Sequence, residues 1–185
     1  ALTNGDYVVN SQYWSNDAGT PNVGAVTLCD ATTGCPAVVS ESNSLIGDSD
    51  GDFIGSGGAT ALAGGRYVVH NLSWDDGGLT NAGASTWCDA DVGCAGMVVS
   101  ASNSTVGSTA FDLVGINTVV LSNGNYVISS SGWDNPTTSA VSAGFAMWCD
   151  ATTGCAVGTI NSDNALVGTA TADQVSNMPV VPLTN

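Results

Sequence analysis

Short apolar runs separated by Gly, Asn, Asp and Thr extend along the whole chain. Residues 7–9 (Tyr-Val-Val) follow an Asn-Gly pair, which is typical of a strand leaving a tight turn. Residues 24–29 alternate with the two-residue period of a strand. Further runs occupy residues 37–40 and 53–54, and no stretch repeats its apolar positions with the helical period. The pattern therefore predicts short strands and no long helix.

The same pattern occurs three times along the chain. The tyrosines that open the first run in each copy, Tyr7, Tyr67 and Tyr126, lie 60 and 59 residues apart. A Trp follows each Tyr by seven residues, and a Cys-Asp-Ala-x-x-Gly-Cys segment comes after it. This self-similarity predicts three tandem repeats of about 60 residues. We place repeat 1 at 2–61, repeat 2 at 62–120 and repeat 3 at 121–182.

With about four strands in each repeat, the expected fold is all-β. We expect one repeat domain over residues 1–185, propeller-like around a pseudo-threefold axis, with a β-trefoil or β-prism as the alternative. Residues 183–185 repeat the Leu-Thr-Asn of residues 2–4. They either begin a next repeat or bring residues 180–183 back onto repeat 1. A larger ring or fibre made of several chains is a further alternative. An unpaired strand edge invites such addition.

The six cysteines occur as three Cys-x5-Cys pairs. A five-residue loop that ends in Gly turns a hairpin and brings the two Cβ atoms within bridging distance. The spacing predicts three local disulfides, Cys29–Cys35, Cys88–Cys94 and Cys149–Cys155. Such bonds place the protein outside a reducing cytoplasm, so we expect an extracellular or cell-surface location.

Composition excludes several classes of function. The formal net charge is −15 and the only Lys or Arg is Arg66, so no basic surface for nucleic acid or anionic lipid can form. Hydrophobic residues make up 43% of the chain against 9% charged, which argues against disorder. No apolar run approaches the roughly 18 residues of a membrane span. We expect no nucleic-acid partner, no membrane insertion and no cofactor other than calcium.

The repeated motifs resemble tandem repeats of large bacterial surface proteins of the filamentous-haemagglutinin-like kind. The matching segments are residues 123–128, Trp133, 24–27, 152–154 and 43–47. The cysteine pairs are an addition to that pattern. The Tyr-Val-Val run followed by Cys-Asp-Ala-Thr-Thr-Gly also looks like blades of kelch-type propellers. The resemblance implies a secreted or surface β-repeat protein and no catalytic residue.

Two kinds of acidic position stand out. Asp48, Asp50 and Asp52 alternate around a Gly, which resembles a calcium loop but lacks the downstream acidic ligand of an EF-hand. A solvated turn is the simpler interpretation. Only the last of these acids recurs, as Asp112 and Asp173, and we expect this shared Asp to cap a turn through backbone N–H groups.

The aromatic residues and the sequons suggest surface recognition. Trp14, Trp74 and Trp133 are candidates for stacking on sugars, although their regular recurrence favours a structural place. Asn71 and Asn103 begin N-glycosylation sequons.

Two further tryptophans, Trp87 and Trp148, directly precede a Cys, and we expect them to pack on the disulfides. His70 has Asn10 and Ser129 as its counterparts and no recognisable nucleophile, so we expect no catalysis through it.

Together these features predict a non-enzymatic, extracellular structural or adhesive protein. Its copies would pair through strand edges or terminal strands into a homopolymeric fibre, sheath or surface layer. A lectin-like carbohydrate-binding module with glycan partners is the alternative, and a secreted hydrolase with two facing carboxylates is the third hypothesis.

Overall fold

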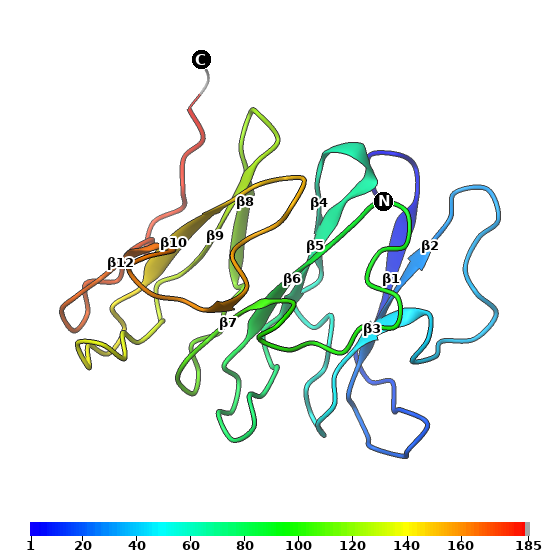
Figure 1. Cartoon of the computed structure of the whole chain (residues 1–185), viewed down its shortest axis with the longest axis horizontal. Helices are drawn as coiled ribbons and strands as arrows, with labels where there is room; N and C mark the ends of the chain where they lie inside the picture. The colour runs from blue at the N-terminus through cyan, green and yellow to red at the C-terminus, as the bar shows by residue number, and fades with distance from the viewer. Residues whose placement is uncertain (184–185) are drawn as a thin grey trace.

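The computed structural model describes residues 1–183 and is all-β. Within these residues, strands and one single-turn 3-10 helix (η1, Ala63–Gly65) form three sheets (Figure 1). The strands are β1 (Tyr7–Ser11), β2 (Ala25–Cys29), β3 (Ser44–Ile46), β4 (Ala59–Ala61), β5 (Tyr67–Asn71), β6 (Ala84–Cys88), β7 (Thr105–Val106), β8 (Asn117–Val120), β9 (Tyr126–Ser130), β10 (Phe145–Cys149), β11 (Gly158–Thr159) and β12 (Leu166–Val167). The expectation of an all-β fold in three tandem repeats is confirmed.

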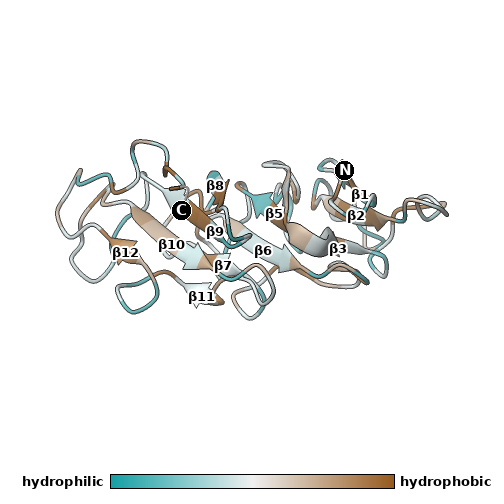
Figure 2. Ribbon diagram, turned by 90° about the horizontal axis from the view of Figure 1, so that it is seen from above, coloured by the Kyte–Doolittle hydropathy of each residue, from teal (hydrophilic) through white to brown (hydrophobic). Residues whose placement is uncertain are grey.

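The three sheets lie side by side in a row, with the N-terminal sheet at one end and the C-terminal sheet at the other (Figure 1). We call them unit 1 (order β1-β2-β3), unit 2 (β4-β5-β6-β7-β11) and unit 3 (β8-β9-β10-β12). A view from above shows the same elongated arrangement (Figure 2). Units 1 and 3 stand at opposite ends of the row, so the expected propeller-like ring is not closed in the single chain.

The sheets are offset from the sequence repeats. β4 ends repeat 1 in sequence but pairs with β5 of repeat 2, and β8 ends repeat 2 but pairs with β9. Each of these sheets therefore takes its first strand from the preceding repeat. The short β3, β7 and β12 strands were not predicted, because two or three residues are too few to show a period.

The run at 37–40 was expected to be a strand, and this expectation was wrong. Residues 37–40 form no strand, and the corresponding part of repeat 2 makes only a bridge from Val98 to Ile46 of unit 1. In repeat 3 the same region becomes β11, which pairs in parallel with β7 of unit 2. In repeats 2 and 3 this region therefore contacts the preceding unit instead of extending its own sheet.

A glycine before the second long strand of each unit is required by close backbone contact. At Gly83 φ is +74° and an added Cβ would lie 2.4 Å from the backbone N of Val114. The corresponding distance is 2.1 Å at Gly24 and 2.5 Å at Gly144. The close approach allows the bridges from these glycines to Ile54, Val114 and Val175. This explains why Gly precedes the cysteine-bearing strand by a fixed spacing.

The three predicted disulfides are confirmed. Cys29–Cys35, Cys88–Cys94 and Cys149–Cys155 join Cα atoms 4.4, 5.1 and 4.3 Å apart. Each bond links the last residue of a long strand to the end of the loop that follows. Asp30 organises the first loop by accepting hydrogen bonds from Thr32 and Thr33, and the Thr32 hydroxyl contributes most to holding its pKa far below the usual range. The disulfides indicate an oxidising, extracellular environment.

The C-terminal segment runs away from unit 1. Residues 179–183 form no strand and lie at the far end of the row from the N-terminus (Figure 1). Of the predicted continuation at 183–185, Thr184 and Asn185 lie outside the described residues. Across residues 1–183 no helix has the length and apolar character to cross a bilayer.

Candidate functional site: the two ends of the row

The junctions between units are built from a repeated set of contacts, beginning with a shared strand. At the first junction β4 covers the outer edge of β5, with Thr60 opposite Val68. At the second junction β8 covers β9 in the same way, with Val119 opposite Val127. In the part of the chain described, no strand covers the matching edge of β1.

The tyrosine that begins β1, β5 or β9 is buried only where the neighbouring strand is present. The side chains of Tyr67 and Tyr126 are 1% and 0% exposed, whereas Tyr7 is 36% exposed. All three begin the same Tyr-Val-Val or Tyr-Val-Ile run. The missing neighbour, and not a difference in local sequence, therefore leaves Tyr7 open to solvent.

The opposite edge of each sheet carries the second contact. β3 receives the segment around Val98 from the next unit, and the N–H of Ile46 donates to the carbonyl of Met97 at 3.0 Å. β7 receives β11 at the second junction. The corresponding strand of unit 3, β12, has no such partner among residues 1–183, and its Leu166 is 69% exposed.

The third contact places a large side chain on the glycine of the next unit's disulfide loop. Leu28 of unit 1 lies over Gly93, where an added Cβ would be 3.2 Å from the Leu28 Cβ. Trp87 of unit 2 lies over Gly154, where that distance is 2.8 Å. The Trp87 indole N–H also donates to the carbonyl of Ala151 at 3.1 Å. Trp87 therefore packs across the junction.

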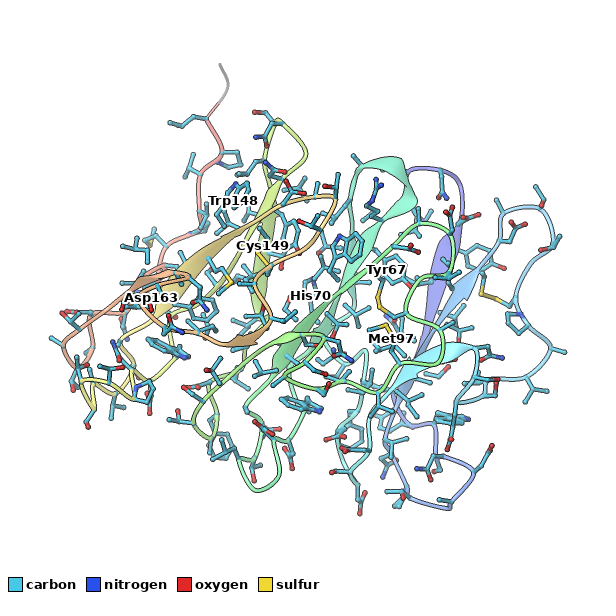
Figure 3. All side chains as sticks on the ribbon, in the orientation of Figure 1. Tyr67, His70, Met97, Trp148, Cys149 and Asp163 are labelled. Carbon is cyan, nitrogen blue, oxygen red and sulfur yellow. A yellow bond between two sulfur atoms is a disulfide. The ribbon has the colours of Figure 1, made fainter. Side chains whose placement is uncertain are left out.

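At the two ends of the row, the residues that correspond to this third contact have no partner among residues 1–183. Trp148, the counterpart of Trp87, is 57% exposed in unit 3 (Figure 3). Gly34, the counterpart of Gly154, has no atom within 4 Å of an added Cβ. The expectation that Trp148 is covered by packing on the disulfide was wrong, because the cover comes from a following unit.

The fourth contact is made by the Asp that recurs in all three repeats. Asp52 accepts hydrogen bonds from the N–H groups of Asp48 and Ser49 in its own turn, and from the N–H of Asp75 in unit 2 at 3.1 Å. Asp112 accepts in the same way from the N–H of Asp134 in unit 3, at 2.9 Å. This Asp therefore caps a turn, as predicted, and also joins two units.

Burial distinguishes the joined acids from the open one. Both Asp52 and Asp112 are fully buried, and this burial raises their pKa values above the ordinary range. Asp173 keeps only the hydrogen bonds of its own turn, first from Ala170 and then from Thr169, and these lower its pKa. The N–H that would complete its contacts corresponds to the N–H groups of Asp75 and Asp134. In repeat 1 this position is Ser15, which is exposed at the other end of the row.

The predicted calcium loop is not assembled. Asp52 is buried and its oxygens accept from backbone N–H groups, so it does not face a common centre with Asp48 and Asp50. Within residues 1–183, no group of three or more His, Cys, Asp or Glu side chains is arranged to hold a metal ion. The alternation of acids reflects a turn whose last residue turns inward.

The predicted sugar-stacking and glycosylation residues are largely interior. Trp74 and Trp133 are buried, so neither offers a ring face to a ligand, while Trp14 is half-buried. Asn71 is fully buried and donates to the hydroxyl of Thr86, which contradicts its prediction as a glycosylation site.

Asn103 is half-buried and its amide donates to the carbonyl of Val98, as its counterpart Asn43 does with Val38. The equivalent Asn164 donates to Thr159. Its place in a turn explains this Asn in every repeat without a glycan.

His70 is part of the first junction. It is buried, and one ring nitrogen, Nε2, lies 2.8 Å from the hydroxyl of Thr60 on β4. Burial lowers its pKa from 6.5 to about 4, so the ring is neutral near pH 7. Because β4 belongs to repeat 1 in sequence, this pair ties two repeats together.

The fold and junctions define an all-β tandem-repeat protein. The chain matches a family described as a repeat of unknown function (DUF5650) three times, over residues 1–56, 61–116 and 120–177. These matches cover most of the chain, which therefore belongs to this repeat family. Neither a curated protein nor a solved structure matches the chain. The comparisons support a tandem repeat and give no support to a haemagglutinin-like or kelch-type identity.

Proposed function

We propose that this chain is an extracellular structural or adhesive repeat protein whose copies join end to end. The observation that carries the proposal is the complementarity of the two ends. Unit 3 exposes one half of each contact that is made at both junctions, and unit 1 exposes the complementary half. Trp148 and Asp173 stand at one end, and Gly34 and Ser15 at the other.

The relation between the ends determines the kind of assembly. A contact between two different surfaces is heterologous, and it continues into an open filament unless its rotation closes a ring. The junctions inside the chain already place successive units in a row (Figure 1). A second copy docked by the same contacts continues that row, which supports a fibre, or a sheath or surface layer made from fibres.

Chemistry and composition support the extracellular part of the proposal. Three disulfides hold the loops that carry Gly34, Gly93 and Gly154 at the junction surfaces.

The net charge determines how assembly should respond to salt. A net charge of −15 with one Arg opposes contact between copies at low salt. Assembly should therefore strengthen as ionic strength rises, because screening removes repulsion while the apolar contact remains.

The experiment compares assembly of the 185-residue chain with that of matched variants. Light scattering and electron microscopy of the oxidised protein should show linear particles that grow with concentration and with salt. Trp148→Gln should shift assembly to at least several-fold higher concentration. Phe111→Gln, which changes an exposed ring in the middle unit, should leave it unchanged. A strictly monomeric chain at high concentration and at 0.5 M salt, on the order of a 4 Å screening length, contradicts the proposal.

Carbohydrate binding is a second candidate because of one groove. A groove of about 650 Å³ beside β1 is lined by Tyr13, Trp14, Asn10 and Gln12, which combine ring faces with amides. Its counterparts in units 2 and 3 contain the buried Trp74 and Trp133, so a threefold set of sugar sites is not formed. Binding on a glycan array that is lost in Trp14→Ala, with no concentration-dependent assembly, would favour this function over the first.

A further inference from the structure

We infer that residues 179–181 of one copy add as an antiparallel strand to β1 of a second copy, with Val181 opposite Val8. The inference rests on the proposed end-to-end assembly and specifies its partner and register. β4 and β8 provide the template, because Thr60 opposes Val68 and Val119 opposes Val127. Leu62, Leu121 and Leu183 mark the same place in the repeats, so Val181 is the counterpart of Thr60 and Val119.

The path to this strand has the right length. Ile54, Val114 and Val175 each bridge to the glycine of their own unit, at Gly24, Gly83 and Gly144. From these anchors the chain reaches Thr60 in six residues and Val119 in five. From Val175 it reaches Val181 in six. Val175 is therefore anchored in unit 3 as Ile54 and Val114 are in units 1 and 2. The residues that follow Val175 have nearly the same length to the strand position as those that lead to β4 and β8.

The two prolines of the segment fit the hydrogen-bond pattern of the template. In unit 2 the N–H of Leu62 donates to Arg66, and the N–H of His70 donates to Gly58, so positions 62, 60 and 58 lie in hydrogen-bonded pairs. In the receiving copy the N–H of Leu2 donates to Asp6 as that of Leu62 does to Arg66, so Ala1 holds the place of Ala61. The added strand therefore ends at Val181, and Pro182 follows where no N–H toward the partner strand is needed.

Pro179 corresponds to Gly58, whose carbonyl accepts from His70 while its N–H bonds elsewhere, to Gly55. Only Val181 needs its own N–H for the ladder, and it has one. Prolines are tolerated on edge strands at such positions.

The groove beside β1 has room for the residue that enters it. In unit 2 the corresponding space is taken by Gly57, where an added Cβ would lie only 2.7 Å from the Cβ of His70. The counterpart of Gly57 in the terminal segment is Met178, which is exposed. In unit 1 the groove beside Asn10 and Gln12 is open and measures about 650 Å³. A flexible Met side chain fills such a space well.

For the chain of 185 residues the partner is a second copy, because the segment lies out of reach of its own β1. Residues 179–183 and β1 are at opposite ends of the row (Figure 1). Addition of an extended segment to an open sheet edge is a common mode of recognition, with main-chain bonds giving affinity and side-chain pockets giving specificity. The exposed faces of Tyr7 and Val9 would be covered by this strand.

Cysteine cross-linking tests the register. Val9 and Val180 would form a non-bonded pair, equivalent to Ala59 opposite Val69, in which the Cβ atoms approach closely enough for a disulfide. Val9→Cys mixed with Val180→Cys should give a dimer cross-link, identified by mass spectrometry, in several-fold excess over Val9→Cys mixed with Val181→Cys. The native disulfides of each variant are verified in the same digest.

A proline pair provides the second measurement. Val181→Pro removes the one N–H that the ladder requires and should raise the concentration needed for assembly at least several-fold, whereas Val180→Pro should leave it nearly unchanged. Assembly with equal cross-linking of both cysteine pairs, or with no cross-link, overturns the strand addition and leaves end-to-end joining intact. Absence of assembly in the unmodified chain overturns both.

Discussion

β1 and β5 contain the same Tyr-Val-Val run but lie in opposite environments. All five residues of β5 are buried between β4 and β6, whereas β1 is covered by β2 alone and its Tyr7 and Val9 are exposed. The comparison shows that the run determines a strand and that the neighbouring unit determines its burial. Stability in such a row is approximately a sum of unit and junction contributions, so the middle unit should be the most stable.

The largest expected effect comes from truncating the tyrosine that the comparison singles out. Tyr67→Ala should lower the free energy of unfolding by about 4 kcal/mol, because it empties a packed site. Tyr7→Ala, at the open end, should lower it by no more than about 2 kcal/mol, since that side chain is already partly solvated. Chemical denaturation measures both. Equal losses would contradict a burial difference caused by the neighbour.

Acid should loosen the first junction through His70. Burial lowers its folded pKa to about 4 from 6.5, so the unfolded chain binds the proton first as pH falls. The free energy of unfolding should therefore decrease between pH 6.5 and 4 by about 3 kcal/mol and change no further from this residue below that range. His70→Ser, which copies Ser129 of unit 3, should flatten this part of the pH profile. A profile identical to that of the unmodified chain would contradict the assignment.

Removing one disulfide should cost less, because each closes a short loop. Replacing Cys88 and Cys94 by Ala should lower the free energy of unfolding by about 2 kcal/mol. The same change at Cys29 and Cys35 should give a similar loss but loosen only the open end. Hydrogen exchange distinguishes the two variants, with reduced protection spreading across both junctions in the first and confined to unit 1 in the second.

The smallest effect on stability is expected at the exposed tryptophan. Trp148→Gln should change the free energy of unfolding by less than about 0.5 kcal/mol, as is usual for an exposed position. Trp87→Gln, at the same place in unit 2, should cost about 3 kcal/mol because it uncovers Gly154 and leaves the Ala151 carbonyl without its donor. Thermal unfolding of the two variants side by side measures the difference, and similar shifts would show that Trp87 is not a junction residue.

The sequence by itself determined the repeat, the strand character and the cysteine pairing. Strand character and cysteine pairing depend on neighbours within about seven residues, as in the alternation of 24–29 or the Cys-x5-Cys loop, and the repeat is the recurrence of these local motifs along the chain. The glycine before each cysteine-bearing strand was visible as a spacing, although its reason, contact with a backbone some 30 residues away, was not.

Only the tertiary structure decided how the repeats share their parts. In the structure β4 and β8 pair with the sheet of the following unit, and Asp52 accepts a hydrogen bond from the N–H of Asp75. Trp87 packs on the loop at Gly154. The structure also separates Trp87 from Trp148, which no local pattern distinguishes. The physical reason is that burial depends on what occupies the other side of a surface, and at these positions that occupant is a neighbouring unit in the row.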